Sequence, residues 1–257
     1  DRYMILSREH LDADLIIWPE TALPDFYHRQ GDFLAEVASL GRVSHTDFLI
    51  GTLYLDEETN FYYNSVVSIS GDEPAFYHKR HLVPFTEYLP LKTLLGSVVD
   101  FMRVPMSDFS SGDRHQGPIS AAGYPVAVSI CFEDDFGEEL ITMLPAAKLL
   151  VNVSNDAWFG DSLAPHQHLQ MARMRALETG RPMLRATNTG VTAITDHWGR
   201  IQVMAKQFEP DAIAAQVQPM DGATPYVKVG NLFIIGLMGF MALFGVAVGR
   251  RATHYGV

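Results

Sequence analysis

Short runs of apolar, largely β-branched residues recur along the chain and are separated by turn-forming segments. Five of these runs predict strands, at 15–18, 48–54, 64–70, 126–131 and 149–155. Two more, at 191–195 and 201–205, flank the sequence DHWGR and predict a β-hairpin. The apolar runs are typical of strands buried on both faces, as in sheets covered by helices. The pattern therefore predicts an α/β fold with mixed strand pairing.

Two stretches between these runs have helical spacing. In GDFLAEVASLGR (31–42) the apolar positions share one face, and Gly41 is a suitable stop. HQHLQMARMRALETG (166–180) follows a proline and ends at Gly180, both of which are common helix boundaries. The apolar stretch 88–109 carries two prolines and fits neither pattern. It is either a mobile lid or a helix packed on the core.

Near the C-terminus the pattern changes to an uncharged apolar run of 21 residues, 229–249. As a helix rising 1.5 Å per residue it would extend about 31 Å, enough to cross a bilayer. The alternative is a buried core helix. Because two arginines follow directly, we expect a transmembrane helix over 226–250, a cytoplasmic tail at 251–257, and the large domain, 1–225, on the other side. The chain starts at Asp1 without a methionine, which favours a part of a longer protein.

Composition narrows the classes of function. The 257 residues carry 19 lysines and arginines against 30 acids, a formal net charge of −11. Such a balance argues against nucleic acid as a partner and against strong attraction to anionic lipid surfaces. The single cysteine excludes an internal disulfide, and no cysteine–histidine spacing resembles a zinc site. His166 and His168 lie two residues apart and so on different faces of a helix. We expect no metal and no cofactor.

Three polar residues lie at or just beyond the ends of apolar runs, where catalytic groups of α/β sheets converge. A thiol nucleophile at Cys131 needs a base, for which Glu20 is suitable, and a positive group, for which Lys79 is suitable. Each also has a simpler interpretation. Cys131 is then a small buried hydrophobe, Lys79 forms a solvated surface pair with Arg80, and Glu20 caps a helix.

Three carboxylates follow the cysteine almost at once, at Glu133, Asp134 and Asp135. Like charge disfavours a thiolate, so these acids are expected to raise the pKa of Cys131. Asp134 and Asp135 have no assigned role and are expected to lie in a solvated loop.

Four stretches together resemble the nitrilase-like domain of the bacterial apolipoprotein N-acyltransferase family. They read IIWPETALP, YHKRHLVPFTEYLP, SICFEDDFGE and NVSNDAWFGDSLAPHQHLQMARMRALETGRPMLRATNTG. General nitrilase-family amidases share the Glu, Lys and Cys positions, whereas HLVPFTEYLP, NDAWFG and the trailing apolar helix point to the acyltransferase branch. The resemblance implies an α-β-β-α sandwich followed by one transmembrane helix. It also implies a larger polytopic membrane protein, whose earlier helices and first sandwich strand precede Asp1.

The resemblance places the family's catalytic triad on Glu20, Lys79 and Cys131. It implies that Glu87 and Glu133 are further essential acids of the active site, which orient the lysine or an incoming amine.

Asn155 and Trp158, within NDAWFG, belong to the supporting residues that the resemblance implies. The family often has tyrosine directly after the nucleophile, where this chain has Phe132. The resemblance therefore implies a role only for the backbone N–H of Phe132, as an oxyanion donor.

The activity implied by the resemblance is a two-step acyl transfer through a thioester on Cys131. The acyl donor is a phospholipid, and the acceptor is the α-amino group of the diacylglyceryl-cysteine at the N-terminus of an apolipoprotein. The implied location is the bacterial inner membrane, with the catalytic domain on the periplasmic side. Two alternatives remain open: an amidase acting on small amides, and a non-catalytic, membrane-tethered module that binds lipoproteins.

Overall fold

The computed structural model describes residues 2–71, 73–88 and 109–255. Two β-sheets lie face to face within these residues. The first has the strand order β1-β2-β3-β4, formed by β1 (Leu15–Phe26), β2 (Asp47–Asp56), β3 (Phe61–Ile69) and β4 (Ala75–His78). The second has the order β10-β9-β8-β7-β6-β5. Its strands are β5 (Ile119–Ala121), β6 (Tyr124–Ile130), β7 (Leu149–Asn155), β8 (Met183–Asn188), β9 (Ala193–Thr195) and β10 (Ile201–Met204).

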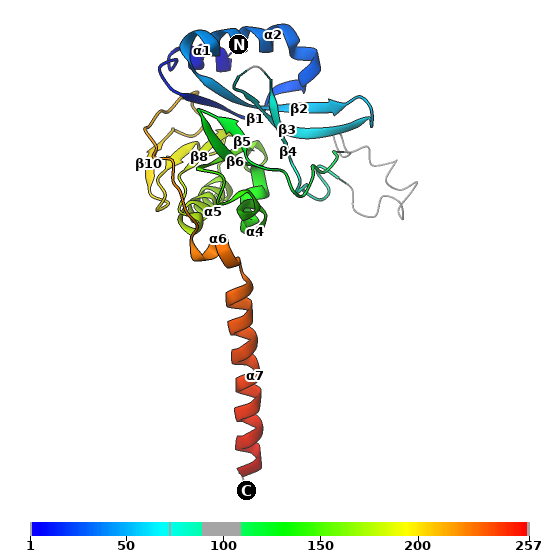
Figure 1. Cartoon of the computed structure of the whole chain (residues 1–257), viewed down its shortest axis with the longest axis vertical. Helices are drawn as coiled ribbons and strands as arrows, with labels where there is room; N and C mark the ends of the chain where they lie inside the picture. The colour runs from blue at the N-terminus through cyan, green and yellow to red at the C-terminus, as the bar shows by residue number, and fades with distance from the viewer. Residues whose placement is uncertain (1, 72, 89–108, 256–257) are drawn as a thin grey trace.

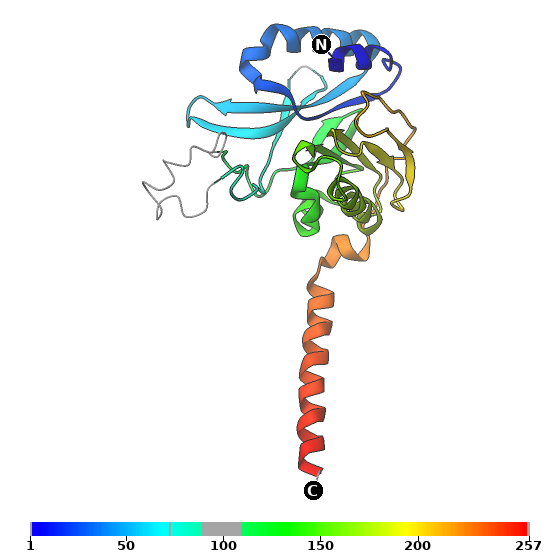
Figure 2. The ribbon, with the colours of Figure 1, turned by 180° about the vertical axis from the view of Figure 1, so that it is seen from behind.

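Helices cover the outer face of each sheet. α1 (Arg2–Arg8) and α2 (Gly31–Ser44) lie over the first sheet, and α4 (Gly137–Leu140) and α5 (Ala164–Thr179) lie over the second (Figures 1 and 2). Short 3₁₀ turns complete the domain: η1 (Tyr27–Gln30), η2 (Cys131–Asp135), η3 (Ile141–Met143) and η4 (Ala157–Phe159). The layers run α-β-β-α, as the resemblance implies.

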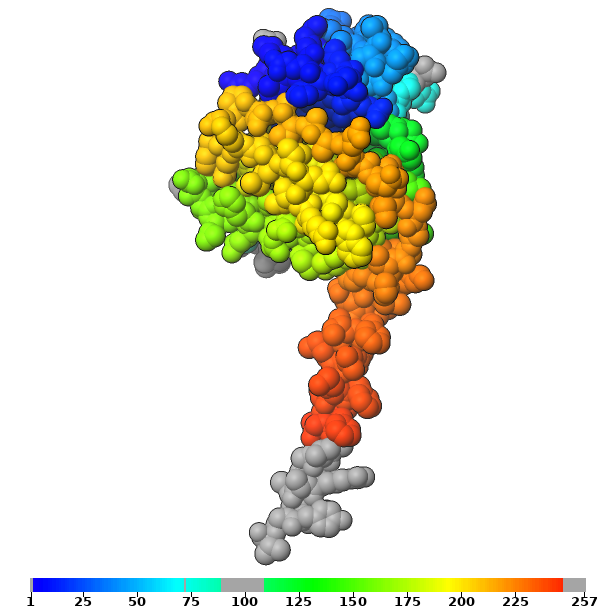
Figure 3. Space-filling model, turned by 90° about the vertical axis from the view of Figure 1, so that its left-hand side faces the viewer, coloured from blue at the N-terminus to red at the C-terminus, as the bar shows by residue number. Residues whose placement is uncertain are grey.

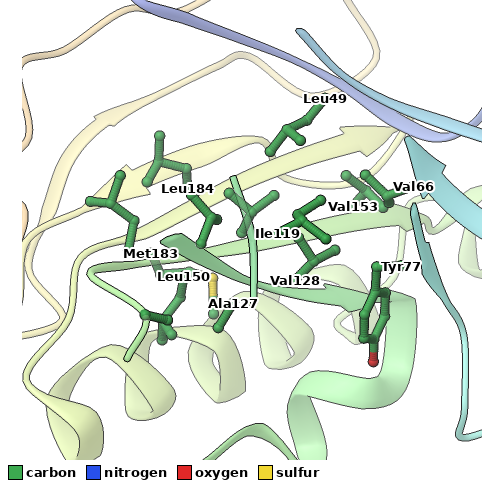
Figure 4. Close-up of a cluster of buried hydrophobic side chains, with 14 of the residues drawn as sticks. Leu49, Val66, Tyr77, Ile119, Ala127, Val128, Leu150, Val153, Met183 and Leu184 are labelled. Atoms are coloured by element: carbon green, nitrogen blue, oxygen red, sulfur yellow. The ribbon is translucent and has the colours of Figure 1, made fainter. Parts of the chain in front are cut away.

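The main core lies between the two sheets and continues beneath α5 (Figure 4). Leu49 and Val66 of the first sheet face Val128 and Val153 of the second, and all four are almost completely buried. Each fully buried aliphatic side chain contributes about 1.5–3 kcal/mol relative to exposure. A second cluster joins α1 and α2 to the first sheet around Trp18. Apolar burial on both faces thus fixes both sheets, as the continuous apolar runs predict.

β1 and β2 approach each other closely at Glu20, the polar residue in the middle of β1, and this approach positions it. The register of the pair shifts between Trp18 and Leu23, so β1 bulges there. A side chain at Gly51 of β2 would place its Cβ 2.2 Å from the carbonyl oxygen of Pro19 and 2.7 Å from Cα of Glu20. Only glycine allows this approach, and Thr21 follows Glu20 with a φ of 50°.

The predicted elements are found, but several boundaries differ. β1 continues past residue 18 to Phe26, and α5 begins at Ala164 and so includes the proline expected to precede it. The five predicted strands lie in β1, β2, β3, β6 and β7, and the predicted hairpin is the antiparallel pair β9–β10. The helix expected at 31–42 is α2, but it continues past Gly41 to Ser44. The glycine serves packing instead, because a Cβ there would lie 2.6 Å from the carbonyl oxygen of Thr46.

Two C-terminal helices follow the domain, α6 (Pro225–Val229) and α7 (Leu232–Tyr255), separated at Gly230, which has a φ of +54°. α7 projects away from the sandwich (Figures 1 and 3). Across the part of the chain that the structure describes, no helix combines the length and apolar character needed to cross a membrane. The span expected at 226–250 therefore stays a prediction. The stretch expected to be a lid or a core helix lies, apart from its ends Tyr88 and Phe109, outside the described residues.

Candidate active site

Four buried polar side chains from separate strands and loops meet in one group, here called the acid–lysine cluster: Glu20, Asn64, Lys79 and Glu87. Glu20 comes from the bulge of β1, Asn64 from β3, and Lys79 follows β4 directly. The ammonium of Lys79 lies 2.7 Å from Oε1 of Glu87 and 3.8 Å from Oε1 of Glu20. Asn64 donates to Oε1 of Glu20 at 2.6 Å. The simple interpretations are wrong for two residues, because Lys79 is not solvated and Glu20 lies within a strand.

The charges in this cluster control one another because water is excluded. Burial alone would lower the pKa of Lys79, but the negative charges of Glu20, of Cys131 once it is ionised, and of Glu87 together outweigh burial and raise it. Burial also raises the pKa of Glu20, and this effect exceeds the opposing influence of Lys79 and Asn64. Lys79 is therefore a fixed cation, and Glu20 is a stronger base than an exposed glutamate.

Cys131 begins the η2 turn immediately after β6, with a φ of +54°. This left-handed conformation is unfavourable for a non-glycine residue and is common where a side chain is held in a functional orientation. The residue is half-buried. Burial, followed by the charge of Glu20, raises the thiol pKa to about 12, while Lys79 and a hydrogen bond with Ser154 act in the opposite direction. The thiol is thus protonated at neutral pH and needs a base.

Glu133 holds the neighbouring loops together. Its buried carboxylate accepts hydrogen bonds from the backbone N–H of Ile130, Arg80 and His81, at 2.8, 2.7 and 3.0 Å, and from the hydroxyl of Tyr77 at 3.0 Å. It thereby ties the end of β6 to the segment that carries Lys79. Glu87, by contrast, touches the lysine ammonium directly.

Asp134 is fully buried, so the expectation that it lies in a solvated loop is wrong. It pairs with Arg185 at 3.3 Å and with Nε2 of His168 at 3.0 Å. Asp135 is half-buried, and burial together with the charge of Asp134 raises its pKa to about 6. Among the charged groups, Glu20 raises the thiol pKa most strongly, although it is distant in the sequence. The three acids that follow the cysteine do not have the largest effect.

Asp134 belongs to a second buried group, here called the carbonyl cluster: Asp134, Asn152, Asp156, His168 and Arg185. Asp156 lies 3.1 Å from Nη2 of Arg185, and its other oxygen lies 3.1 Å from Nδ1 of His168. Burial would lower the pKa of His168, but hydrogen bonds with the two aspartates raise it to about 9. His166, two residues earlier, is exposed. Within the described part of the chain, no group of side chains is arranged to hold a metal ion.

The remaining predicted residues differ in how near they lie to these clusters. The backbone N–H of Asn155 donates a hydrogen bond to the side-chain carboxylate of Glu20. Phe132 follows the cysteine, and its ring is 42% exposed and packs edge-on against Phe136. Trp158, on η4, is 80% exposed, so its side chain is not part of either cluster.

A protonated thiol beside a buried carboxylate and a fixed cation is suited to acyl transfer. The carboxylate can take the thiol proton as sulfur attacks a carbonyl carbon, and the cation can stabilise the resulting oxyanion. The sequence patterns did not reveal Asn64 or the carbonyl cluster. Their only signal was polar residues inside otherwise apolar strands, as at Asn152 in LLVNVSN.

The fold and this arrangement define a class of hydrolase-like enzymes. Residues 3–225 match the carbon-nitrogen hydrolase family, and the chain belongs to that family.

The closer relatives share a narrower name. The chain is similar to an apolipoprotein N-acyltransferase of Methylococcus capsulatus, at 51% identity over 98% of this chain and 50% of the relative. It is also similar to an apolipoprotein N-acyltransferase of Nitrosomonas europaea, at 49% identity over 93% of this chain and 49% of the relative. The chain thus spans about half the length of these curated relatives. The resemblance inferred from the motifs is confirmed.

Solved structures of more distant proteins share the fold. A carbon-nitrogen hydrolase from Helicobacter pylori superposes with a TM-score of 0.58 at 15% identity, covering 80% of this chain and 78% of the other. The Caenorhabditis elegans NitFhit protein gives a TM-score of 0.58 at 18% identity, covering 80% and 54%. At such identities the likeness concerns the fold alone, a nitrilase-like α/β sandwich.

Proposed function

We propose that this chain is the catalytic part of a bacterial apolipoprotein N-acyltransferase. It transfers an acyl chain from a phospholipid to the α-amino group of the N-terminal diacylglyceryl-cysteine of apolipoproteins. The names of the relatives support this activity. The observation that carries the chemistry is the buried acid–lysine cluster, whose Glu20 and Lys79 charges act on the thiol of Cys131.

The first half-reaction loads the enzyme. Glu20 takes the proton of the Cys131 thiol as sulfur attacks the sn-1 ester carbonyl of the phospholipid. The ammonium of Lys79 and the backbone N–H of Phe132 stabilise the oxyanion. The carbon–oxygen bond then breaks, and Glu20 protonates the departing alkoxide of the lysophospholipid. The acyl chain remains as a thioester on Cys131.

The second half-reaction transfers the acyl chain from Cys131 to the lipoprotein. The neutral α-amine of the lipoprotein attacks the thioester carbonyl, and Glu20 removes a proton from the attacking nitrogen. The carbon–sulfur bond breaks, the thiolate recovers its proton from Glu20, and the N-acylated lipoprotein leaves. The raised pKa of Glu20 suits both directions of transfer, because the carboxylate has to accept and return a proton near neutral pH.

The two remaining acids have separate roles in this proposal. Glu87, at 2.7 Å, fixes the position of the Lys79 ammonium. Glu133 fixes the backbone on both sides of the site through its hydrogen bonds with Ile130, Arg80 and His81.

We further propose that residues 226–250 anchor the enzyme in the bacterial inner membrane, with the sandwich on the periplasmic side and 251–257 in the cytoplasm. Exposed apolar side chains along α7 support membrane contact, among them Leu232, Phe240 and Leu243, at 74, 66 and 73% exposure. Such a continuous exposed apolar surface is unusual for a helix in water. Both substrates are lipids, which fits this location.

The activity is tested with purified protein in detergent, a phospholipid with a labelled sn-1 chain, and a diacylglyceryl-cysteine peptide. The expected product is the peptide with one labelled acyl group on its α-amine. A peptide whose α-amine is already acetylated is the matched control and should remain unlabelled. Release of ammonia from small amides without peptide acylation would instead establish an amidase.

A further inference from the structure

The backbone carbonyl of Cys131 has an unusual set of partners. Its oxygen accepts a hydrogen bond from Nδ2 of Asn152 at 3.0 Å and lies 3.2 Å from Nε2 of His168. The two donors come from β7 and α5, elements separate from the β6–η2 elbow that carries the cysteine. The residue they hold has a φ of +54°. A left-handed conformation at a non-glycine residue costs about 1–3 kcal/mol and persists only where surrounding contacts impose it.

The geometry around His168 determines which ring nitrogen carries a proton toward the cysteine. Nε2 faces two acceptors, the Cys131 carbonyl and Oδ1 of Asp134 at 3.0 Å. It therefore carries a proton whatever the state of Nδ1, which lies 3.1 Å from Oδ1 of Asp156 and 2.8 Å from Nη2 of Arg185. The Nε2–H bond toward the carbonyl is a fixed property of the site.

The other members of the carbonyl cluster hold the two donors in place. Arg185 lies between Asp134 and Asp156 and also donates to the side-chain oxygen of Asn152. His168 is 6% exposed and Asn152 is fully buried, so water does not compete for either side chain. None of its five side chains belongs to the acid–lysine cluster, and the charge of Asp156 has a smaller effect on the thiol pKa than that of Glu20. Toward the backbone of the cysteine, the cluster presents two donors aimed at one carbonyl oxygen.

We propose that His168 and Asn152 are positioning residues, which hold the Cys131 carbonyl so that the strained elbow keeps the thiol where the charges of Glu20 and Lys79 act on it. The proposal rests on the proposed acyl transfer for its consequence in catalysis, but its geometric part concerns the thiol alone. Without the two donors the elbow relaxes toward an ordinary conformation. The thiol then leaves its buried position and loses the alignment that the base requires.

The chain offers a direct readout, because Cys131 is its only cysteine. The rate of alkylation by iodoacetamide, followed by intact mass across a pH series, reports the apparent pKa of this thiol and of no other. In the wild type, burial and Glu20 hold that pKa at about 12. A thiol released from the elbow should titrate nearer the ordinary value of 9.0.

Three single variants separate positioning from general stability. His168→Asn removes the Nε2 donor, whereas His168→Gln places an amide donor at nearly the same distance along the side chain. His166→Asn alters an exposed histidine of the same helix and is the matched control. Circular dichroism and the melting temperature in detergent establish that each variant is folded.

For folded His168→Asn we expect alkylation at pH 8 to rise at least about tenfold, as one unit of pKa implies, while kcat for acyl transfer falls about tenfold with little change in KM. His168→Gln and His166→Asn should remain within about threefold of the wild type in both measurements. If His168→Asn does not fold, Asn152→Ser removes the second donor, and the same pair of changes is expected.

Wild-type alkylation and kcat in a folded His168→Asn would overturn the proposal. The proposal would also be overturned if His168→Gln changed alkylation and kcat as much as His168→Asn does, because the Nε2 donor would then not be the group that matters. A wild-type protein that transfers no acyl chain would overturn the proposed function. In that case the alkylation profiles alone still decide whether the elbow is held by these two donors.

Discussion

Two buried charged clusters flank Cys131, and they differ in which part of the cysteine they act on. The acid–lysine cluster sets two carboxylates against one ammonium, and its charges act on the thiol. The carbonyl cluster sets two aspartates against Arg185 and His168, and its hydrogen bonds to the cysteine go to the backbone oxygen. Among the charges, Glu20 and Lys79 of the first cluster act on the thiol pKa most strongly, and the second cluster adds only a smaller charge effect through Asp156. We infer that the first performs proton transfer and the second maintains geometry.

The difference explains why a thiol with such a high pKa is compatible with nucleophilic catalysis. Lys79 favours the thiolate, but burial and Glu20 disfavour it more strongly. In the proposed mechanism the thiol is therefore neutral at rest, and the thiolate forms only as Glu20 removes the proton. A thiolate that persisted without substrate would be open to oxidation and adventitious alkylation, so this mechanism would also protect the thiol.

Removal of the nucleophile should have the largest effect. Cys131→Ala is expected to abolish acyl transfer, to less than about a thousandth of the wild-type rate, while the protein stays folded. Cys131→Ser should be nearly inactive as well, because a hydroxyl is far less acidic than a thiol. The labelled-phospholipid assay measures both. Normal transfer by Cys131→Ala would exclude the mechanism.

Neutralising Glu20 should change the rate of acyl transfer and the rate of Cys131 alkylation in opposite directions. Glu20→Gln is expected to lower acyl transfer about a hundredfold to ten-thousandfold, because proton transfer is lost. The same change should accelerate alkylation of Cys131, since the charge of Glu20 raises the thiol pKa.

Lys79→Met provides the opposite control for that experiment. It removes the charge that lowers the thiol pKa, so alkylation should become slower than in the wild type. If Glu20→Gln and Lys79→Met shift alkylation in the same direction, the electrostatic account of the acid–lysine cluster is wrong.

Weakening the contact that positions Lys79 should reduce acyl transfer by a smaller factor. Glu87→Gln replaces the carboxylate nearest to the ammonium with a neutral group, and we expect kcat to fall about tenfold to a hundredfold. Glu209→Gln is the matched control, because Glu209 pairs with Lys206 on the surface at 3.8 Å. Equal kcat values for the two variants would show that Glu87 does not position Lys79.

The carbonyl cluster predicts the smallest effect, a dependence of stability on pH. The folded-state pKa of His168 is about 9, above the ordinary value of 6.5. Its contribution to the free energy of unfolding is therefore complete below pH 6.5 and is lost as pH rises through 9, on the order of 3 kcal/mol. Melting temperatures from pH 6 to 10 should fall more steeply for the wild type than for His168→Gln. Parallel curves would contradict this assignment.

The sequence predicts the parts of this molecule whose physical origin is local. Apolar runs at 48–54 and 149–155 predict strands because burial on both faces leaves a continuous apolar pattern. Gly180 ends α5 as its position predicts, in a left-handed conformation with a φ of 65°. Gly41 does not end α2, because its role is close packing against a residue outside the helix, which no local pattern reveals.

The candidate site divides in the same way. Cys131, Glu20 and Lys79 are predicted from the sequence because each stands at or near the end of an apolar run within a recognisable motif. Asp134 is mistaken for a loop residue because acids in a row indicate solvent unless their partners are known. Those partners, His168 and Arg185, lie 34 and 51 residues further along the chain. Long-range pairing of buried charges is a property of the fold and leaves no periodic signal.

The central claim is that the acyl chain passes through a covalent bond to Cys131. Intact-mass measurement of the purified protein after incubation with phospholipid alone tests it most directly. The account predicts an increase equal to one acyl chain, removable by hydroxylamine and absent from Cys131→Ala. Unmodified protein under conditions in which the complete reaction proceeds at its normal rate would contradict it.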